Sequence, residues 1–172
     1  MKQGYIHVYT GNGKGKTTAA IGLAVRAAGA GLQVYIAQFV KGREYSELKA
    51  LERFSDSITL KQYGRGCFIR NEPSPEDVNA ARRGLEDVCG LMSRGEYDLV
   101  ILDEACIALY YNLFTLDELS VCLDRREEGV EVVITGRQAP EGLIKKADLV
   151  TEMKEVKHYY QDGVEARTGI EK

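Results

Sequence analysis

The sequence predicts an α/β fold, with a mostly parallel sheet that is covered by helices on both faces. Apolar runs of strand length alternate with stretches of helical periodicity along the chain. A glycine-rich loop joins the first apolar run to the first helical stretch. The length of 172 residues, of which 44% are hydrophobic and 28% charged, suits a single domain with one sizeable core.

The first half of the chain contains three predicted strands. Residues 5–9 form an apolar run, and an Ala-rich helix follows the glycine loop from about residue 16. Residues 33–39 are predicted to form the second strand, because apolar side chains occupy most of that stretch. A helix is expected near 44–54, and a shorter strand over 58–62.

A long helix is predicted to begin after Ser74. Serine is a favoured N-cap, Pro75 suits the first helical position, and the acidic residues that follow suit the first turn. The apolar residues beyond them have helical spacing. Residues 99–102 are a continuous apolar run, typical of a strand that is buried on both faces, and 105–110 again has helical character.

The last third of the chain repeats the alternation. Thr115 and Glu118 form a capping-box pattern that predicts a helix start. A strand is expected at 130–135, a short helix at 140–146 and a last short strand at 149–153. The polar residues beyond 153 are expected to wrap the domain or to fray. We therefore expect one domain over residues 1–172, with 154–172 as a C-terminal tail.

Composition excludes several classes of protein. The net charge of −3 gives no overall basic field that would attract nucleic acid. No apolar run approaches the length needed to cross a membrane. Because the chain reaches its first strand after four residues, we expect no signal peptide. These features predict a cytoplasmic protein without a nucleic-acid or membrane partner.

The four cysteines are scattered and contain no Cys-x-x-Cys pair, so metal-ligand spacing is absent. They are Cys67, Cys89, Cys106 and Cys122. We interpret each as a small buried apolar residue in a reduced setting, and not as a reactive thiol. With only two histidines, the chain also offers few candidates for a histidine base.

The glycine loop resembles the phosphate-binding pattern G-x-x-x-x-G-K-[ST]. Gly15, Lys16 and Thr17 match it, and Thr10 stands where the pattern has its first glycine. Backbone N–H groups and the helix N-terminus would face the phosphates, Lys16 would neutralise them, and Thr17 would ligate Mg²⁺. The alternative is a glycine-rich turn with a chance match. The predicted ATP-binding residues of the loop are Gly11, Asn12, Gly13, Lys14, Gly15, Lys16, Thr17 and Thr18. The predicted fold is therefore P-loop NTPase-like, of the RecA-like kind.

Parallel sheets bind ligands at the carboxyl ends of their strands. Five segments leave those ends and are expected to converge on one cleft. They are residues 10–18, 40–45, 63–73, 103–112 and 136–141.

Acidic and basic residues follow two of these strands. Asp103 ends a buried strand, an arrangement that holds a carboxylate near Mg²⁺, and Glu104 is adjacent. The alternative for this pair is an acidic helix start. Arg137 would reach the phosphates or the nucleoside, or it would be a solvated loop residue. Lys41 would bind an anion or be solvated. The predicted metal ligands are thus Thr17, Asp103 and Glu104, and Lys16 and Glu104 are the candidate catalytic residues.

The stretch 63–70 combines glycines, arginines and apolar residues in a predicted surface loop. An apolar loop at the edge of the active site would suit a large, flat organic ligand. The candidate ligand-binding residues are Arg65, Gly66, Phe68 and Ile69. Alternatively, Phe68 and Ile69 plug into the core.

Several segments together resemble the ATP:corrinoid adenosyltransferases of the cobalamin pathway. They are Gly-Asn-Gly-Lys-Gly-Lys-Thr-Thr at 11–18, Gln-Phe-Val-Lys-Gly at 38–42, Gly-Arg-Gly at 64–66, Leu-Asp-Glu at 102–104, Thr-Gly-Arg at 135–137, Ala-Asp-Leu-Val-Thr-Glu-Met at 147–153 and Val-Lys-His at 156–158. They occur in the family's order and run nearly end to end. The glycine loop joined to the last segments makes the resemblance specific.

The resemblance implies a reaction and its participants. A corrinoid reduced to Co(I) attacks the 5′ carbon of ATP, and inorganic triphosphate leaves. ATP lies reversed relative to ordinary P-loop enzymes. Thr17 and Glu104 would contact Mg²⁺, with Asp103 nearby. Arg65, Gly66, Phe68 and Ile69 would contact the corrinoid. The resemblance also implies an electron-donor protein, such as a flavodoxin or flavin reductase, and a homodimer.

The sequence departs from the family in two respects. It begins almost at its first strand, so we expect it to lack the N-terminal segment that helps some members to cover the corrinoid. It also contains no tryptophan, whereas some members place aromatic residues after the position of Gly66 to strip the lower axial ligand from cobalt. Phe68 or Ile69 would then act as an apolar wedge. Either departure favours a different corrinoid preference, such as incomplete corrinoids.

Two rival functions remain open from the residues themselves. A P-loop kinase or ATPase would transfer the γ-phosphoryl group and produce ADP, with Glu104 orienting the water. A non-catalytic nucleotide-binding module would bind ATP without corrinoid-dependent turnover. The phosphate product separates these classes.

Overall fold

The computed structural model describes residues 2–42, 46–65, 69 and 72–171. The strands are β1 (Ile6–Thr10), β2 (Val34–Phe39), β3 (Ile58–Tyr63), β4 (Leu99–Asp103), β5 (Glu131–Thr135) and β6 (Leu149–Glu152). The helices are α1 (Lys16–Gly29), α2 (Ser46–Leu51), α3 (Pro75–Ser93), α4 (Ala105–Tyr110), α5 (Leu116–Asp124) and α6 (Glu141–Lys146), with short 3₁₀ turns at Glu52–Phe54 and Tyr159–Asp162.

The six strands form one sheet in the order β3-β2-β4-β5-β1-β6. Every strand pairing in it is parallel. The predicted α/β fold is confirmed, and the sheet is wholly parallel. All strands therefore end at the same edge of the sheet, and the segments that follow them gather there.

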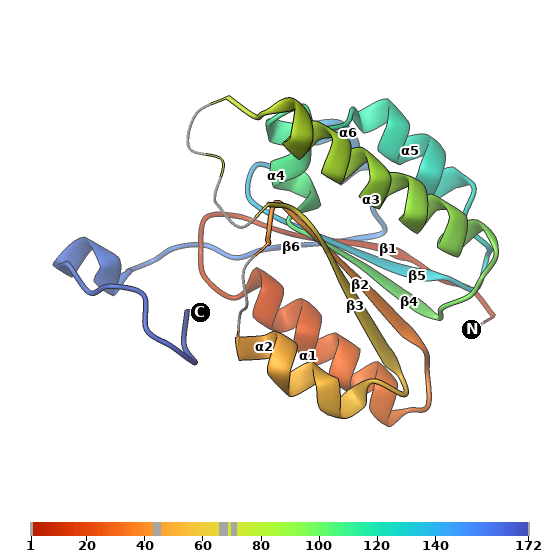
Figure 1. Cartoon of the computed structure of the whole chain (residues 1–172), viewed down its shortest axis with the longest axis horizontal. Helices are drawn as coiled ribbons and strands as arrows, with labels where there is room; N and C mark the ends of the chain where they lie inside the picture. Colours follow the sequence, from red (N-terminus) through yellow and green to blue (C-terminus); the bar gives the residue numbers. More distant parts are fainter. Residues whose placement is uncertain (1, 43–45, 66–68, 70–71, 172) are drawn as a thin grey trace.

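Helices cover both faces of the sheet, as predicted. Figure 1 shows α1 and α2 on one face and α3, α4, α5 and α6 on the other. Along β2, Val34 and Ile36 pack toward α1, whereas Tyr35, Ala37 and Phe39 join the larger core under α3 and α4. Both faces of this strand are buried, so its residues read as an almost continuous apolar run.

The predicted caps form at the two longest helices of the second face. The side chain of Ser74 accepts a hydrogen bond from the Asp77 N–H, and Asp77 accepts one from the Ser74 N–H, which completes a capping box at α3. Thr115 and Glu118 make the same reciprocal pair at α5. Each box satisfies N–H groups that a helix start otherwise leaves without partners.

The cysteine interpretation is wrong for two residues. The structure joins Cys89 of α3 and Cys122 of α5 in a disulfide, with Cα atoms 5.0 Å apart. The sequence offered no Cys-x-x-Cys signal, because the partners lie on different helices that meet only in the folded core. Cys106 is a free, buried thiol, as expected, and burial raises its pKa to about 12. Cys67 lies outside the described residues.

The residues after β6 leave the body of the domain. Figure 1 shows the segment beyond Glu152 running away from the sheet to a short turn at Tyr159–Asp162, after which the chain turns back toward the C-terminus. Lys14 links the phosphate loop to this tail, because its ammonium group donates a hydrogen bond to the carbonyl oxygen of Ile170 at 2.7 Å. Among the described residues, no helix has both the length and the apolar character that crossing a membrane requires.

Candidate functional site

The glycine loop connects β1 to α1, as predicted. Gly15 caps α1 with φ 116°, and Gly11 has φ 95°, so both adopt a backbone conformation that favours glycine. Lys16 is the first residue of the helix and is buried. Its ammonium group lies across the loop and donates hydrogen bonds to the carbonyl oxygens of Gly11 (2.7 Å) and Gly13 (2.8 Å).

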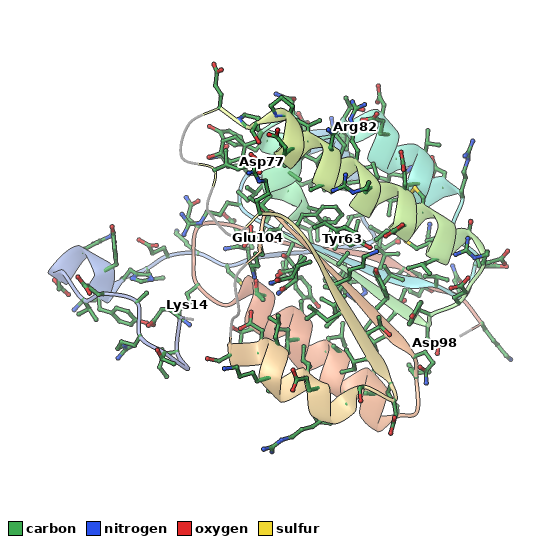
Figure 2. The ribbon with its side chains drawn as sticks, viewed as in Figure 1. Lys14, Tyr63, Asp77, Arg82, Asp98 and Glu104 are labelled. Atoms are coloured by element: carbon green, nitrogen blue, oxygen red, sulfur yellow. A yellow bond between two sulfur atoms is a disulfide. The ribbon has the colours of Figure 1, made fainter. Side chains whose placement is uncertain are left out.

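Other loop residues predicted to bind ATP have different surroundings. The N–H of Gly13 donates to the carbonyl oxygen of Met153 at 2.6 Å, so this donor is used within the protein. Asn12 and Thr18 are exposed. Lys14 is also exposed and contacts the tail; Figure 2 shows it on the side of the loop that faces the tail. The contribution of each to nucleotide binding stays a prediction.

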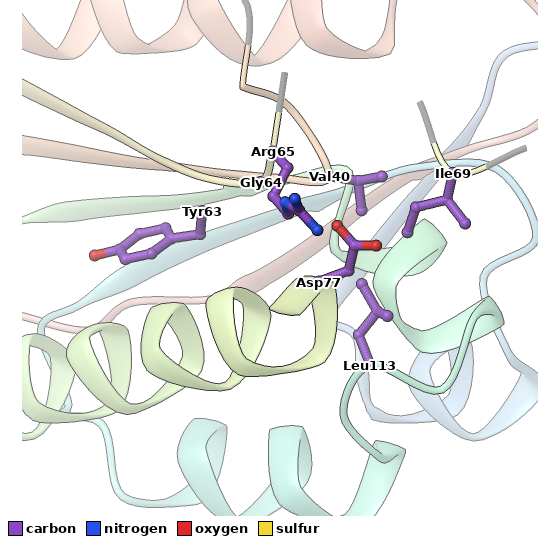
Figure 3. Close-up of a pocket in the computed structure, with 7 residues that line it drawn as sticks. All are labelled: Val40, Tyr63, Gly64, Arg65, Ile69, Asp77 and Leu113. Atoms are coloured by element: carbon purple, nitrogen blue, oxygen red, sulfur yellow. The ribbon is translucent and has the colours of Figure 1, made fainter. Parts of the chain in front are cut away.

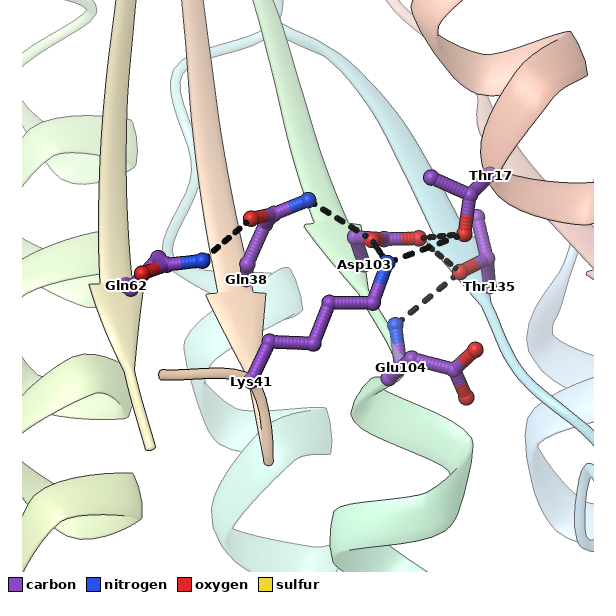
Figure 4. A network of polar contacts seen from close by, with 7 residues as sticks. All are labelled: Thr17, Gln38, Lys41, Gln62, Asp103, Glu104 and Thr135. Carbon is purple, nitrogen blue, oxygen red and sulfur yellow. Dashed lines mark hydrogen bonds and ion pairs between the residues drawn. The ribbon is translucent and has the colours of Figure 1, made fainter. Parts of the chain in front are cut away.

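Asp103, at the end of β4, is the centre of a buried polar network, which Figure 4 shows. Its Oδ1 atom accepts hydrogen bonds from the hydroxyl groups of Thr17 (2.8 Å) and Thr135 (2.7 Å). Its Oδ2 atom accepts one from the ammonium group of Lys41 (2.7 Å) and a longer one from the side-chain amide of Gln38 (3.3 Å). Only 1% of Asp103 is exposed, so these partners replace water around the carboxylate.

The parallel register brings these residues together. Gln38 near the end of β2 pairs with Asp103 at the end of β4. Thr135 ends β5, whose Ile134 pairs with Leu102 one residue before Asp103. Residues at equivalent heights of adjacent parallel strands are neighbours, so their side chains meet at one edge of the sheet.

Glu104 follows Asp103 and is the N-cap residue before α4, with φ 60°. Its N–H donates to the hydroxyl of Thr135 at 3.0 Å. Burial raises the pKa of its carboxyl group, and the negative charge of Asp103 adds to this effect. The positive charges of Lys41 and Lys16 oppose it. A bound cation would likewise favour the ionised form.

The three basic groups of the site have different surroundings. Burial lowers the pKa of Lys16, and the charge of Glu104 opposes the shift. Burial also acts to lower the pKa of Lys41, but the charge of Asp103 and its hydrogen bond outweigh this and leave the pKa raised. Arg137 is exposed after β5, and its charge acts on the pKa of both Lys16 and Glu104. It therefore lies on the loop's side of the sheet edge, as predicted.

The predicted corrinoid-binding residues are only partly described. Arg65 donates hydrogen bonds to Ser74 (3.2 Å) and Glu76 (3.3 Å) at the start of α3. Ile69 is half-buried and packs against the larger core, and its carbonyl oxygen accepts a hydrogen bond from the Tyr111 hydroxyl at 3.2 Å. Gly66 and Phe68 lie outside the described residues.

A small pocket lies beside this loop, shown in Figure 3. Its lining residues come from the ends of β2 and β3, from the start of α3 and from the segment after α4. They are Val40, Tyr63, Gly64, Arg65, Ile69, Asp77 and Leu113. Both Arg65 and Ile69, predicted from the sequence to contact a flat organic ligand, therefore line one hollow.

The donor set around Asp103 fits a divalent cation. A threonine hydroxyl and a carboxylate, Thr17 and Asp103, both contact the positively charged group of Lys41, which shows that this position accepts a cation. Hard oxygen donors of this kind suit Mg²⁺. Among the described residues, no group of three or more His, Cys, Asp or Glu side chains gathers as a metal site.

Sequence reasoning missed three members of the network. The sequence indicates Gln38 and Thr135 only as parts of the segments that carry the resemblance, and it predicts Lys41 to bind an anion or to be solvated, not to pair with a buried carboxylate. The structure buries all of Gln38 and Thr135, and leaves 12% of the Lys41 side chain exposed. The three residues share one feature that could have identified them. Each lies at or near the carboxyl end of a strand that is adjacent to β4 in the sheet.

A glycine loop follows the first strand and opens the first helix, and Thr17 of that helix contacts a buried aspartate at the end of β4. β4 lies two strands from β1 in the sheet. This arrangement defines a P-loop nucleotide-binding protein. The family model described as ATP:corrinoid adenosyltransferase BtuR/CobO/CobP matches residues 2–171. The chain belongs to this family of ATP-dependent transferases.

Characterised relatives agree with the family match. The chain is 34% identical over 171 residues to a corrinoid adenosyltransferase of Pseudomonas aeruginosa, which covers 99% of this chain and 84% of the relative. It is 36% identical to the corrinoid adenosyltransferase of Escherichia coli K12, covering 99% and 86%. A corrinoid adenosyltransferase of a Sinorhizobium species is 35% identical, with 99% and 81% covered.

Proposed function

We propose that this protein transfers the 5′-deoxyadenosyl group of ATP to the Co(I) centre of a corrinoid, in cobalamin biosynthesis or salvage. The family match over residues 2–171 carries the proposal. The geometry supports it, because the phosphate loop and the Asp103 network lie together at the edge of the sheet where nucleotides bind.

The reaction requires little acid–base chemistry from the protein. The Co(I) substrate supplies an electron pair to the 5′ carbon, the Co–C bond forms, and the C–O bond to the triphosphate breaks. The triphosphate leaves as a polyanion. The protein must hold the carbon near the cobalt and neutralise the leaving group.

Lys16 is the proposed residue for that neutralisation. Its ammonium group already lies across the loop, and a triphosphate would replace the carbonyl oxygens of Gly11 and Gly13 as its partner. The helix N-terminus, Lys14 and Arg137 would add positive potential. We propose Gly11–Thr18 and Arg137 as the nucleotide-binding set.

Thr17, Asp103 and Glu104 would hold Mg²⁺, which when bound stabilises negative charge on the triphosphate. The support is the contact of 2.8 Å between Thr17 and Asp103, together with the half-buried position of Glu104 directly after Asp103 in the chain. In this arrangement Asp103 orients the hydroxyl of Thr17, while the carboxylate of Glu104 supplies charge at the edge of the same site.

We propose that the corrinoid lies over the loop that follows β3, in contact with Arg65, Gly66, Phe68 and Ile69. The support is that Arg65 and Ile69 line the same small hollow; a corrinoid is far larger than this hollow and would lie over it. The protein would act as one domain over residues 1–172 with a tail at 154–172, in the cytoplasm, as a homodimer. A flavodoxin or flavin reductase would reduce the cobalt, because Co(I) requires an electron donor.

The test is an anaerobic assay with ATP, Mg²⁺ and chemically reduced cobalamin. The corrinoid spectrum is followed, and the phosphate product is identified. A light-sensitive adenosylated corrinoid with stoichiometric triphosphate is expected. Formation of ADP without a Co–C bond would place the protein among phosphoryl-transfer enzymes, and ATP binding without turnover would make it a nucleotide-binding module.

A further inference from the structure

The ammonium group of Lys41 contacts two of the three groups that are proposed to bind the metal, Thr17 and Asp103 (Figure 4). It lies 2.7 Å from Oδ2 of Asp103 and 3.3 Å from the hydroxyl oxygen of Thr17. Thr17 donates its own proton to Oδ1 of the same carboxylate at 2.8 Å. A positive charge of the protein therefore sits between a hydroxyl oxygen and a carboxylate oxygen.

We propose that Lys41 is an internal cation that occupies the metal position of this site and must leave it when Mg²⁺ and ATP bind. The inference rests on the proposed function only in that a metal–nucleotide complex binds at the phosphate loop. Lys41 is here a positioning residue, because it acts through Thr17 and Asp103.

The competition follows from the oxygen atoms involved. Thr17 donates its proton to Asp103, so its two lone pairs remain for cations, and the ammonium group of Lys41 already takes one of them. The Oδ2 atom of Asp103 likewise faces the ammonium group. A divalent cation and an ammonium ion so close together would also repel each other in this buried site.

Lys41 stabilises the protein until the metal arrives. The Asp103 carboxylate is 1% exposed, and a buried charge needs a counter-charge. Lys41 supplies it, and Mg²⁺ would supply it afterwards. The flexible four-carbon stem of a lysine lets its ammonium group swing to a new partner, and the incoming phosphates offer one close by.

The backbone around Lys41 lies against the start of the loop that is proposed to contact the corrinoid. Val40 has φ 60°, a strained conformation for a β-branched residue. A Cβ atom added to Gly64 would lie 2.5 Å from the backbone nitrogen of Lys41. One added to Gly42 would lie 2.5 Å from the carbonyl carbon of Arg65. The two chain segments are thus in backbone contact at the residues that open the corrinoid loop.

The test measures metal binding without any corrinoid. Free Mn²⁺ is followed by electron paramagnetic resonance during titration of the protein with ATP present, for wild type and Lys41→Gln. Glutamine keeps a hydrogen-bond donor and removes the charge. We expect Lys41→Gln to bind Mn²⁺ about tenfold more tightly, because the competing cation is gone. The control Lys145→Gln removes an equal charge from an exposed side chain of α6 and should match wild type.

Equal or weaker binding of Mn²⁺ by a folded Lys41→Gln protein would overturn the proposal, because it would make Lys41 a phosphate ligand or a purely structural residue. Thermal unfolding gives a second readout. Without ligands, Lys41→Gln should unfold at a lower temperature than wild type. Addition of Mn²⁺ and ATP should raise the unfolding midpoint of the variant by more than it raises that of wild type. If Lys41 had only a structural role, the substitution would lower the midpoint of the variant equally with and without Mn²⁺ and ATP.

A measurement on the wild-type protein keeps the proposal testable if the variant does not fold. In a crystal structure with Mg²⁺ and ATP, the Lys41 nitrogen should lie beyond about 4 Å from Oδ2 of Asp103, the usual limit of an ion pair. Retention of the 2.7 Å contact would refute it. Neither experiment contains corrinoid. A negative result here would therefore refute the role of Lys41 without refuting adenosyl transfer. A negative corrinoid assay would likewise leave the metal-binding result valid.

Discussion

The backbone N–H of Gly13 donates a hydrogen bond to the carbonyl oxygen of Met153 at 2.6 Å, which fastens the phosphate loop to the segment after β6. The Met153 N–H in turn donates to the carbonyl oxygen of Thr10 at 2.8 Å. A Cβ atom added to Gly13 would lie 2.6 Å from the Met153 carbonyl oxygen, and one added to Gly11 would lie 2.5 Å from it. Both glycines are therefore required by a close approach of two backbones.

Gly13→Ala should separate the loop from Met153. The methyl group has no room, so we expect a loss of about 2 kcal/mol in the free energy of unfolding, with weaker ATP binding. Urea unfolding and calorimetric titration with ATP measure the two effects. The matched control is Gly22→Ala in α1, where an added Cβ meets nothing within 4 Å. That variant should be as stable as wild type or more so by up to about 1 kcal/mol, and a Gly13→Ala protein that behaved like it would contradict the prediction.

Lys16→Ala should abolish most adenosyl transfer while the fold survives. The lysine neutralises the leaving triphosphate, and we expect turnover to fall at least about 100-fold. Circular dichroism should match wild type, because the partners of Lys16 are carbonyl oxygens of its own loop. Lys145→Ala, on exposed α6, is the activity control. Normal turnover by a folded Lys16→Ala protein would refute the assigned role.

Asp103→Asn should destabilise the protein more than Thr135→Val, which removes one neutral partner of the same carboxylate. It leaves the buried Lys41 without its carboxylate, which costs about 3 kcal/mol. Thr135→Val removes one neutral donor to the same carboxylate and should cost about 1 kcal/mol. Urea unfolding of both variants gives the comparison. Equal losses would mean that charge pairing with Lys41 contributes little.

Asp87→Asn should reduce stability in a pH-dependent way. Hydrogen bonds from Lys61 (2.6 Å) and the Tyr63 hydroxyl (2.7 Å) lower the pKa of the Asp87 carboxyl group. A lowered carboxyl pKa contributes stability above the unfolded value of about 3.9, and that stability is lost as pH falls through the lower folded value. The free energy of unfolding of the variant should be lower by about 1 kcal/mol at neutral pH, a small loss because the side chains of Asp87 and Lys61 are both about half exposed. Urea unfolding near neutral pH and in acid should show that the difference in unfolding free energy between wild type and variant shrinks in acid. A difference that stayed constant with pH would argue against the ionic contribution.

Phe68→Ala should impair the reaction mainly when the cobalt begins as Co(II). If the residue is an apolar wedge that favours loss of the lower axial ligand, it assists reduction and not the attack on ATP. Activity should then fall more with Co(II) plus reductant than with Co(I) reduced beforehand. The two assays are run on the same preparation, and equal losses would count against the wedge.

Local sequence patterns determined the elements. The buried runs gave strands within one or two residues of their predicted bounds, and the two capping boxes at Ser74 and Thr115 began helices as predicted. These signals work because backbone groups at a helix start and apolar side chains on a buried strand are satisfied by near neighbours. The glycine loop was identified for the same reason, since its pattern is contiguous in the chain.

The tertiary structure alone decided which side chains meet. Thr17, Lys41, Asp103 and Thr135 form one network only because β2, β4 and β5 lie side by side, an order that chain sequence does not give. The same holds for Cys89 and Cys122, which two helices bring together. The burial of Lys41 depends on that order too, since a lysine after a strand is solvated unless a neighbouring strand presents a carboxylate. The sequence by itself therefore determined the α/β fold, the phosphate loop and the resemblance to a family, while packing between distant strands determined where the charges lie.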